Sequence, residues 1–309
     1  MKSNSCTLCL SGLNGSNPVA FLAALGAFRS ISEIFPERTV GLSWIPAGGA
    51  WAALLHTSEK TNPEELVELL HKHLETRANH AAVTVADNLK MPASQFRAYA
   101  KEAAGAWMNG AETAWAEFAA AFGSDGVLDE DGKIEDTAFR TMSGAGHQHF
   151  LKFMNELARE TSAKQVSEAL FGPWQYRDVG FSMRWDPEDD RRYALRWFNP
   201  SGDAARNVRG ANRLAIEGVR LYPTMPSNSH LATTGFTGQK ASNTFLSWPI
   251  WKAPISLDTC RSLLAHTELT KPSPASNACR AIGIVAVLRS QRITTGKFRN
   301  FTPAQVVAT

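Results

Sequence analysis

The chain has 309 residues, of which 44% are hydrophobic and 20% are charged. These values are typical of a globular protein, so they exclude wholesale disorder and allow one large or two ordinary domains. The net charge of +3 is unevenly distributed: residues 1–180 contain 15 Lys and Arg against 21 Asp and Glu, whereas residues 221–309 contain 9 against 2. A basic second half indicates binding of a polyanion or an acidic partner; the alternative is that the two halves dock on each other.

The N-terminal region predicts a short strand followed by a buried helix. A strand is expected at residues 7–13, and Asn17 and Pro18 form an N-cap and first helical residue for a helix over residues 19–34. Gly26 in the middle of this helix indicates close packing against another element. The apolar run before Arg29 is too short to span a membrane and follows no basic leader, so we expect a soluble, cytoplasmic protein without a membrane partner.

Helices are then expected to dominate up to residue 171. Residues 39–45 and 51–55 predict a hairpin of two strands, and Asn62 caps a helix that begins at Pro63. Residues 93–122 predict two helices broken near Asn109, with Trp107 and the later aromatic residues in the core. Two further helices are expected over residues 147–160 and 162–171.

The remainder of the chain is β-rich by pattern. Strands are expected at residues 181–185, 193–198, 221–225, 245–251, 282–289 and 292–301, and helices at 211–218, ended by Gly218, and at 257–266. The predicted fold class is therefore α+β, with a helix-rich N-terminal half and a β-rich C-terminal half. We place a domain boundary at the acidic loop 124–136, giving an N-terminal region 1–123 and a basic α+β region 137–309.

Arginines interleaved with aromatic residues give the strongest binding signal. Guanidinium groups fit phosphates two bonds at a time, and aromatic rings stack on bases, a combination that suits a nucleic acid, particularly a single strand or RNA. The predicted nucleic-acid-binding residues are Arg184, Arg191, Arg192, Arg196, Arg206, Arg209, Arg213, Arg289, Arg292, Lys297 and Arg299. The alternative is that the aromatic residues form the core and that part of the arginine charge pairs with nearby carboxylates.

Metal and catalytic motifs are weak. Cys6 and Cys9 have the spacing of half a zinc site that nothing completes, so buried free thiols are expected in preference to zinc, and no cofactor is predicted. The carboxylates of Asp186, Asp189 and Asp190 could hold Mg²⁺ in a nuclease, although the adjacent arginines favour a self-neutralised turn. No phosphate-binding loop, nucleophile elbow or cysteine–histidine signature is present, and no catalytic residue is predicted.

Several strings resemble a known family. The opening LSGLNGSNPVAFLAALGAFR is similar to that of large-subunit-type proteins of CRISPR type I-U (I-G) effector complexes, and RWDPEDDRRYALRW, RGANRLAIEG, TTGF and WPIW resemble the same kind of protein. Those large subunits are much longer chains, so this would be a compact variant or a different subunit of a related complex. The resemblance implies a non-enzymatic, Cascade-type subunit that contacts guide RNA or target DNA and neighbouring subunits in an antiviral ribonucleoprotein.

Our leading hypothesis is therefore a nucleic-acid-binding subunit of a CRISPR-type antiviral effector. The alternatives are a metal-dependent nuclease that uses the Asp186–Asp190 cluster, and a scaffold whose acidic residues 1–180 dock a basic partner.

Overall fold

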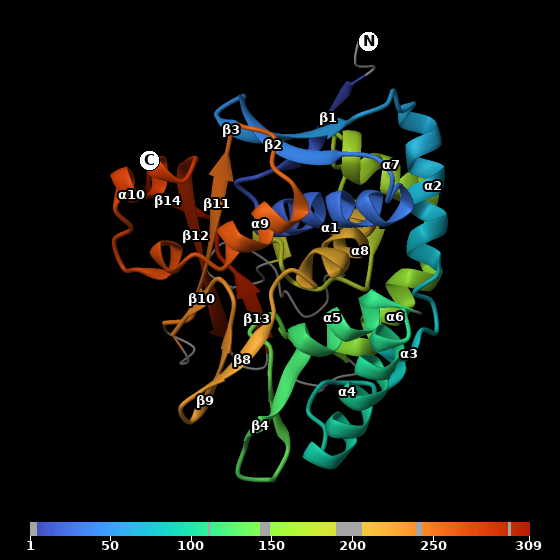
Figure 1. The fold of residues 1–309 in the computed structure, drawn as a ribbon, viewed down its shortest axis with the longest axis vertical. Coiled ribbons are helices and arrows are strands. Elements are labelled where there is room, and N and C mark those ends of the chain that lie inside the picture. Colours follow the sequence, from blue (N-terminus) through green and yellow to red (C-terminus); the bar gives the residue numbers. More distant parts are fainter. Residues whose placement is uncertain (1–4, 111, 143–148, 190–205, 239–242, 296–297) are drawn as a thin grey trace, which may run out of the picture.

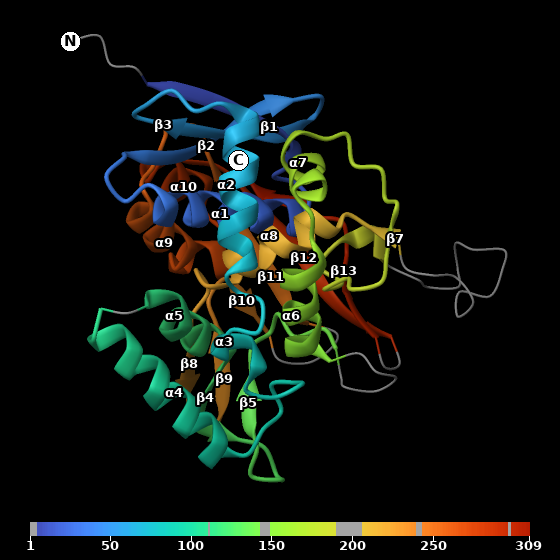
Figure 2. The same cartoon turned by 90° about the vertical axis from the view of Figure 1, so that its right-hand side faces the viewer.

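The computed structural model describes residues 5–110, 112–142, 149–189, 206–238, 243–295 and 298–309. It is an α+β fold in which helices dominate the N-terminal half and strands dominate near the C-terminus, as predicted. Figure 1 shows helices α1 and α8 crossing at the centre, a three-stranded sheet above them and the C-terminal sheet to one side. Helices α4 and α5 lie at the opposite end of the molecule from the three-stranded sheet, as the view turned by 90° in Figure 2 also shows.

Most helices lie within one or two residues of their predicted ranges. The α-helices are α1 (Pro18–Ile34), α2 (Pro63–Glu75), α3 (Ala81–Thr84), α4 (Ala93–Met108), α5 (Thr113–Phe122), α6 (Phe150–Glu160), α7 (Ala163–Phe171), α8 (Arg209–Val219), α9 (Leu257–Leu264) and α10 (Ser276–Ala281). The predicted caps are confirmed: the side chain of Asn17 accepts from Val19 N and Ala20 N, and that of Asn62 accepts from Glu64 N. Helices α3 and α10 were not predicted, because they are too short to show a periodic pattern.

Within the described residues, strands form one three-stranded sheet, one five-stranded sheet and three two-stranded sheets. They are β1 (Cys6–Asn14), β2 (Val40–Ala47), β3 (Ala50–Thr57), β4 (Gly123–Leu128), β5 (Ile134–Asp136), β6 (Asp178–Val179), β7 (Arg206–Asn207), β8 (Thr224–Ser227), β9 (His230–Thr233), β10 (Phe236–Thr237), β11 (Phe245–Trp251), β12 (Ile284–Thr295), β13 (Phe298–Phe301) and β14 (Gln305–Ala308). The first sheet has the order β1-β3-β2 and the large sheet the order β10-β11-β12-β13, with β14 also paired to β12.

Glycines bring α1 and α8 into backbone contact. A Cβ atom on Gly26 would lie 1.8 Å from the carbonyl oxygen of Leu214, and one on Gly218 would lie 2.2 Å from that of Leu22. The expectation that Gly26 permits close packing is therefore confirmed. The prediction that Gly218 ends its helix is wrong, because α8 continues to Val219 and Gly218 forms the α8 side of the crossing.

An aromatic cluster joins the two sheets to α1. The ring of Phe21 stacks on Trp44 with centroids 5.4 Å apart, and Trp248 lies 5.7 Å from Phe21. Trp251 donates from its indole nitrogen to Leu42 O at 2.7 Å, and Trp248 donates to Gly15 O at 2.8 Å. Residues from both predicted regions, from Leu10 to Ala308, thus belong to one hydrophobic core. The hairpin 123–136 lies against Pro226 rather than between two separate cores.

Three further expectations differ from the structure. Residues 181–185 alternate in sequence but form no strand, because Phe181 and Arg184 have positive φ angles of 43° and 59°. The strands predicted at residues 282–289 and 292–301 are divided differently: β12 runs through Ser290, where it pairs with β11, to Thr295, and residues 298–301 form the separate strand β13. Trp107 was expected in the core and is 57% exposed.

Substitution of the crossing glycines tests this packing. We expect Gly218→Ala to lower the free energy of unfolding by about 3 kcal/mol, because the added methyl group meets backbone atoms that cannot move independently. Gly105→Ala in α4 is the matched control: a Cβ there meets nothing within 4 Å, so better helix propensity raises the stability by about 1 kcal/mol. Urea denaturation measures both, and equal effects of the two substitutions would contradict the packing described.

Candidate nucleic-acid interface

The predicted phosphate-binding residues fall into different environments. Arg191, Arg192, Arg196 and Lys297 lie outside the described residues. The seven others are described, and they range from the fully buried Arg213 to the exposed Arg206.

Arg213 lies in the interior and is not part of an exposed surface. It is 1% exposed, and its Nη2 atom donates to Leu74 O at 2.9 Å and to Glu217 Oε1 at 2.8 Å. Arg184 is also buried, at 8% exposure. Both arginines were expected to face a ligand, because a sequence shows the number of arginines but not which carboxylate or carbonyl reaches each one.

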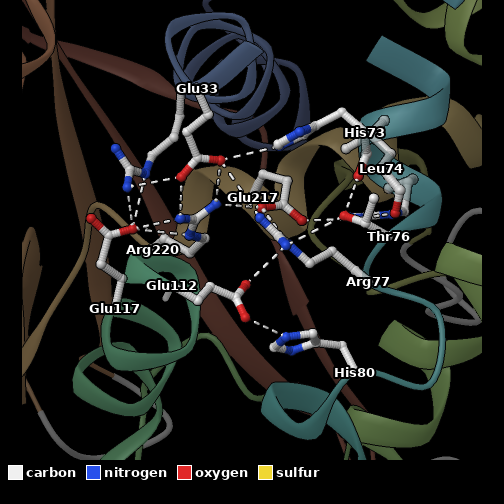
Figure 3. Close-up of polar contacts among 12 residues, drawn as sticks. Glu33, His73, Leu74, Thr76, Arg77, His80, Glu112, Glu117, Glu217 and Arg220 are labelled. Atoms are coloured by element: carbon white, nitrogen blue, oxygen red, sulfur yellow. Dashed lines mark hydrogen bonds and ion pairs between the residues drawn. The ribbon is translucent and has the colours of Figure 1, made fainter. Parts of the chain in front are cut away.

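Arg213 belongs to a buried ion network at the crossing of α1 and α8, which we call the central network (Figure 3). Its members come from α1, α5, α8, α9 and the segment after α2, and they are Arg29, Glu33, Arg77, Glu112, Glu117, Arg213, Glu217, Arg220 and Arg261. Arg220 lies at its centre and donates to Glu33 at 2.6 Å, to Glu117 at 2.7 Å and to Glu217 at 2.7 Å. Five arginines face four glutamates, so most of the buried charge is compensated within the chain.

The central network also forms the floor of a cleft of about 1000 Å³ between α5 and α9. Small side chains, including Ala116 and Ala265, line the walls, and Trp107 lies at the rim. On the floor, both carboxylate oxygens of Glu117 accept hydrogen bonds from arginines, Oε1 from Arg261 and Oε2 from Arg220. A carboxylate so fully paired is a poor general base or metal ligand.

Charge pairing lowers the pKa of Glu217. Burial by itself would raise the pKa of this carboxyl, but the guanidinium groups of Arg213, Arg220 and Arg77 outweigh burial and lower the pKa to about 2. The pKa of Glu33 is also lowered, since burial is outweighed by its hydrogen bond from His73 and by Arg220. Carboxyl groups with lowered pKa values stabilise the folded state most when they are ionised.

We therefore expect acid to weaken the protein through the central network. The folded-state pKa of Glu217 lies below its usual value of 4.5, so its contribution is complete above pH 4.5 and is lost as the pH falls towards 2. Glu217→Gln leaves Arg213 and Arg220 without this charge partner and should lower the free energy of unfolding at pH 7 by about 3–5 kcal/mol. In urea denaturation at pH 7 and pH 3, the variant should lose less stability between the two pH values than the wild type.

Glu68→Gln, on the exposed face of α2, is the matched control. It should change the free energy of unfolding at pH 7 and at pH 3 by no more than about 0.5 kcal/mol. A Glu217→Gln variant as stable as the wild type at pH 7 would contradict the role given to the central network.

Arg289 holds a loop in place. Its guanidinium donates to Leu269 O at 3.0 Å, Lys271 O at 2.6 Å and Pro272 O at 2.9 Å, and its Nε atom donates to Ser247 Oγ at 2.8 Å. Arg289 therefore fastens residues 267–272 to the large sheet, and its donors are directed at backbone carbonyls rather than outward.

The aspartates of the nuclease alternative help to position the start of α1. Asp186 is 2% exposed and accepts hydrogen bonds from Asn17 Nδ2 at 2.9 Å and from Tyr176 Oη at 3.1 Å. Asp189 is also buried and accepts a hydrogen bond from the Ser182 hydroxyl, whereas Asp190 lies outside the described residues. Within the described part of the chain, no three His, Cys, Asp or Glu side chains are grouped as ligands for a metal ion.

Exposed arginines gather at the β6–β7 hairpin. Arg206 in β7 pairs in register with Val179 in β6, and Arg177 immediately precedes β6; both arginines are exposed and form no ion pair with any described residue. Arg209 follows at the start of α8 and is only partly exposed: its guanidinium lies 5.7 Å from the ring of Phe181, donates to Val179 O at 3.2 Å and pairs with Glu160 Oε2 at 3.5 Å. We call Arg177, Arg206 and Arg209 the hairpin arginines. Sequence reasoning missed Arg177, which lies four residues before the segment 181–218 where the arginines are concentrated.

Arg292 and Arg299 are brought together by the β12–β13 hairpin. Arg292 is 9% exposed and donates to Ala138 O at 2.6 Å, and Arg299 donates to Arg140 O at 3.2 Å. These two predicted residues therefore lie beside a third arginine, Arg140, which sequence reasoning missed because nothing near it in the chain marks it as part of a basic group.

Comparison with known proteins assigns no family: no family model matches the chain, and neither a curated protein nor a solved structure matches it. Among the helices that the structure describes, none is both long and apolar enough to cross a membrane.

Proposed function

We propose that the protein is a non-enzymatic nucleic-acid-binding subunit of a CRISPR-type antiviral ribonucleoprotein effector. The observation that carries the proposal is the group of hairpin arginines, of which Arg177 and Arg206 are exposed cations without a carboxylate partner among the described residues. Exposed guanidinium groups of this kind contact phosphates of a nucleic-acid backbone.

Position in the chain strengthens this proposal. The hairpin arginines stand at both ends of residues 180–205, and by sequence this stretch also contains Arg191, Arg192 and Arg196. The resemblance of the N-terminal and central strings to CRISPR large-subunit-type proteins supplies the class of complex. In such complexes, base pairing reads the sequence while proteins hold the backbones, which requires cations rather than a catalytic group. The neighbouring subunits would be further partners.

Loss of the two unpaired hairpin arginines tests the proposal. We expect wild-type protein to bind a labelled 20-nucleotide single strand with an affinity that falls as salt rises, because binding releases counterions. Arg177→Gln combined with Arg206→Gln should weaken binding and reduce the slope of log affinity against log salt by about 1.4–1.8, since each phosphate contact contributes ~0.7–0.9. Fluorescence anisotropy over a series of salt concentrations measures both quantities.

The matched control is Lys101→Gln combined with Lys252→Gln, which removes two exposed cations from other elements and should leave the slope unchanged. An affinity that is independent of salt, or an equal loss of affinity in the two double variants, would refute the proposed function.

A further inference from the structure

A compact group of arginines lies where the β12–β13 hairpin meets the segment that follows β5. Arg292 pairs in register with Phe301, and Arg299 pairs with Thr294. Residues two apart on a strand share a face, so the two arginine side chains project from the same face of the hairpin as diagonal neighbours. Both donate to the backbone of residues 138–140, and this brings them to the side chain of Arg140.

The group contains more positive than negative charge. Arg140 donates from Nε to Asp136 Oδ2 at 2.6 Å and from Nη1 to Met142 O at 2.6 Å. Asp136 is the one carboxylate that forms an ion pair with any of the three arginines within the described residues. Three guanidinium groups and one carboxylate leave two positive charges that the described chain does not compensate.

This excess lies in the interior. Arg140 is 5% exposed and Arg292 is 9% exposed, and the Nε atom of Arg292 is buried without a hydrogen-bond acceptor. Burial, followed by the charge of Arg299, lowers the pKa of Arg292 to about 10. Buried charges of one sign destabilise a folded chain unless an opposite charge reaches them. Arg299 is partly exposed, so the group is accessible from solvent on that side.

We propose that Arg140, Arg292 and Arg299 form an oxyanion site that binds one dianionic phosphate group. A phosphate monoester carries a charge of about −1.5 to −2 at pH 7, which matches the excess of two, whereas a backbone phosphodiester carries only one. Its oxygens accept several hydrogen bonds from guanidinium groups. The phosphate is either free inorganic phosphate or the terminal phosphate of a nucleotide chain; only the second source depends on the proposed function.

Thermal unfolding in inorganic phosphate tests the site itself. Near-saturating phosphate should raise the Tm of the wild type by about 5 °C relative to NaCl of the same ionic strength, since the anion binds only the folded state. Arg299→Gln and Arg292→Met should each abolish this difference, and Lys252→Gln, an exposed cation outside both arginine groups, should retain it. Arg292→Met should also raise the Tm in phosphate-free buffer, because it removes an uncompensated buried charge while keeping the volume filled.

A Tm that responds equally to phosphate and chloride, or a phosphate effect that survives in Arg299→Gln, would overturn the site. If Arg292→Met does not fold, the response of the wild type to phosphate and the Arg299→Gln variant still decide the test, because Arg299 is partly exposed and its substitution is less disruptive.

Paired oligonucleotides identify the source of the phosphate. If the ligand is a terminal phosphate, the wild type should bind an oligonucleotide phosphorylated at both ends at least 10-fold more tightly than the same chain with hydroxyl ends, and Arg299→Gln should remove the difference. If inorganic phosphate stabilises the protein but both oligonucleotides bind equally, the site stands with the free anion as its ligand. If both bind equally and phosphate has no effect, the oxyanion site fails while the proposed function stands.

Discussion

The contact between α1 and α8 is the constraint on which the rest of the structure depends. Gly26 and Gly218 allow the two backbones to touch, and the central network fills the space beside them with paired charges. Arg220 joins Glu33 of α1 to Glu117 of α5, which are separated from it by 187 and 103 residues. The crossing thus fixes three helices at once, and the two sheets pack around it through the aromatic cluster of Phe21, Trp44 and Trp248.

Four of the strings singled out in the sequence meet in this same region. Asn17 of the opening string caps α1 with its side-chain oxygen. The side-chain amide of the same residue donates to Asp186 of the RWDPEDD string. Gly26 lies in the same opening string as Asn17, Gly218 ends RGANRLAIEG, and Trp251 of WPIW donates to Leu42 O. These residue types are therefore explained by the architecture of the core.

Sequence reasoning succeeded where structure depends on near neighbours. Side-chain caps such as Asn17 and Asn62, and the break between α4 and α5, need only a few residues around them. It failed where distant contacts decide: residues 181–185 alternate like a strand, but the chain turns at Phe181 and Arg184 to bury Trp185 against Phe139. The same limit applies to the candidate site. Charge counting predicted a basic second half, yet which arginines are neutralised depends on carboxylates far away in the chain, so Arg213 was included and Arg140 and Arg177 were not.

The central claim is that uncompensated arginines of the second half contact a nucleic acid, and cross-linking tests it most directly. Single strands of RNA and DNA that carry thio-uracil can be photo-cross-linked to the protein and the attached peptides identified by mass spectrometry. The account predicts cross-links within residues 165–220, beside the hairpin arginines. Cross-links confined to residues 58–110, or no cross-links at all, would contradict it.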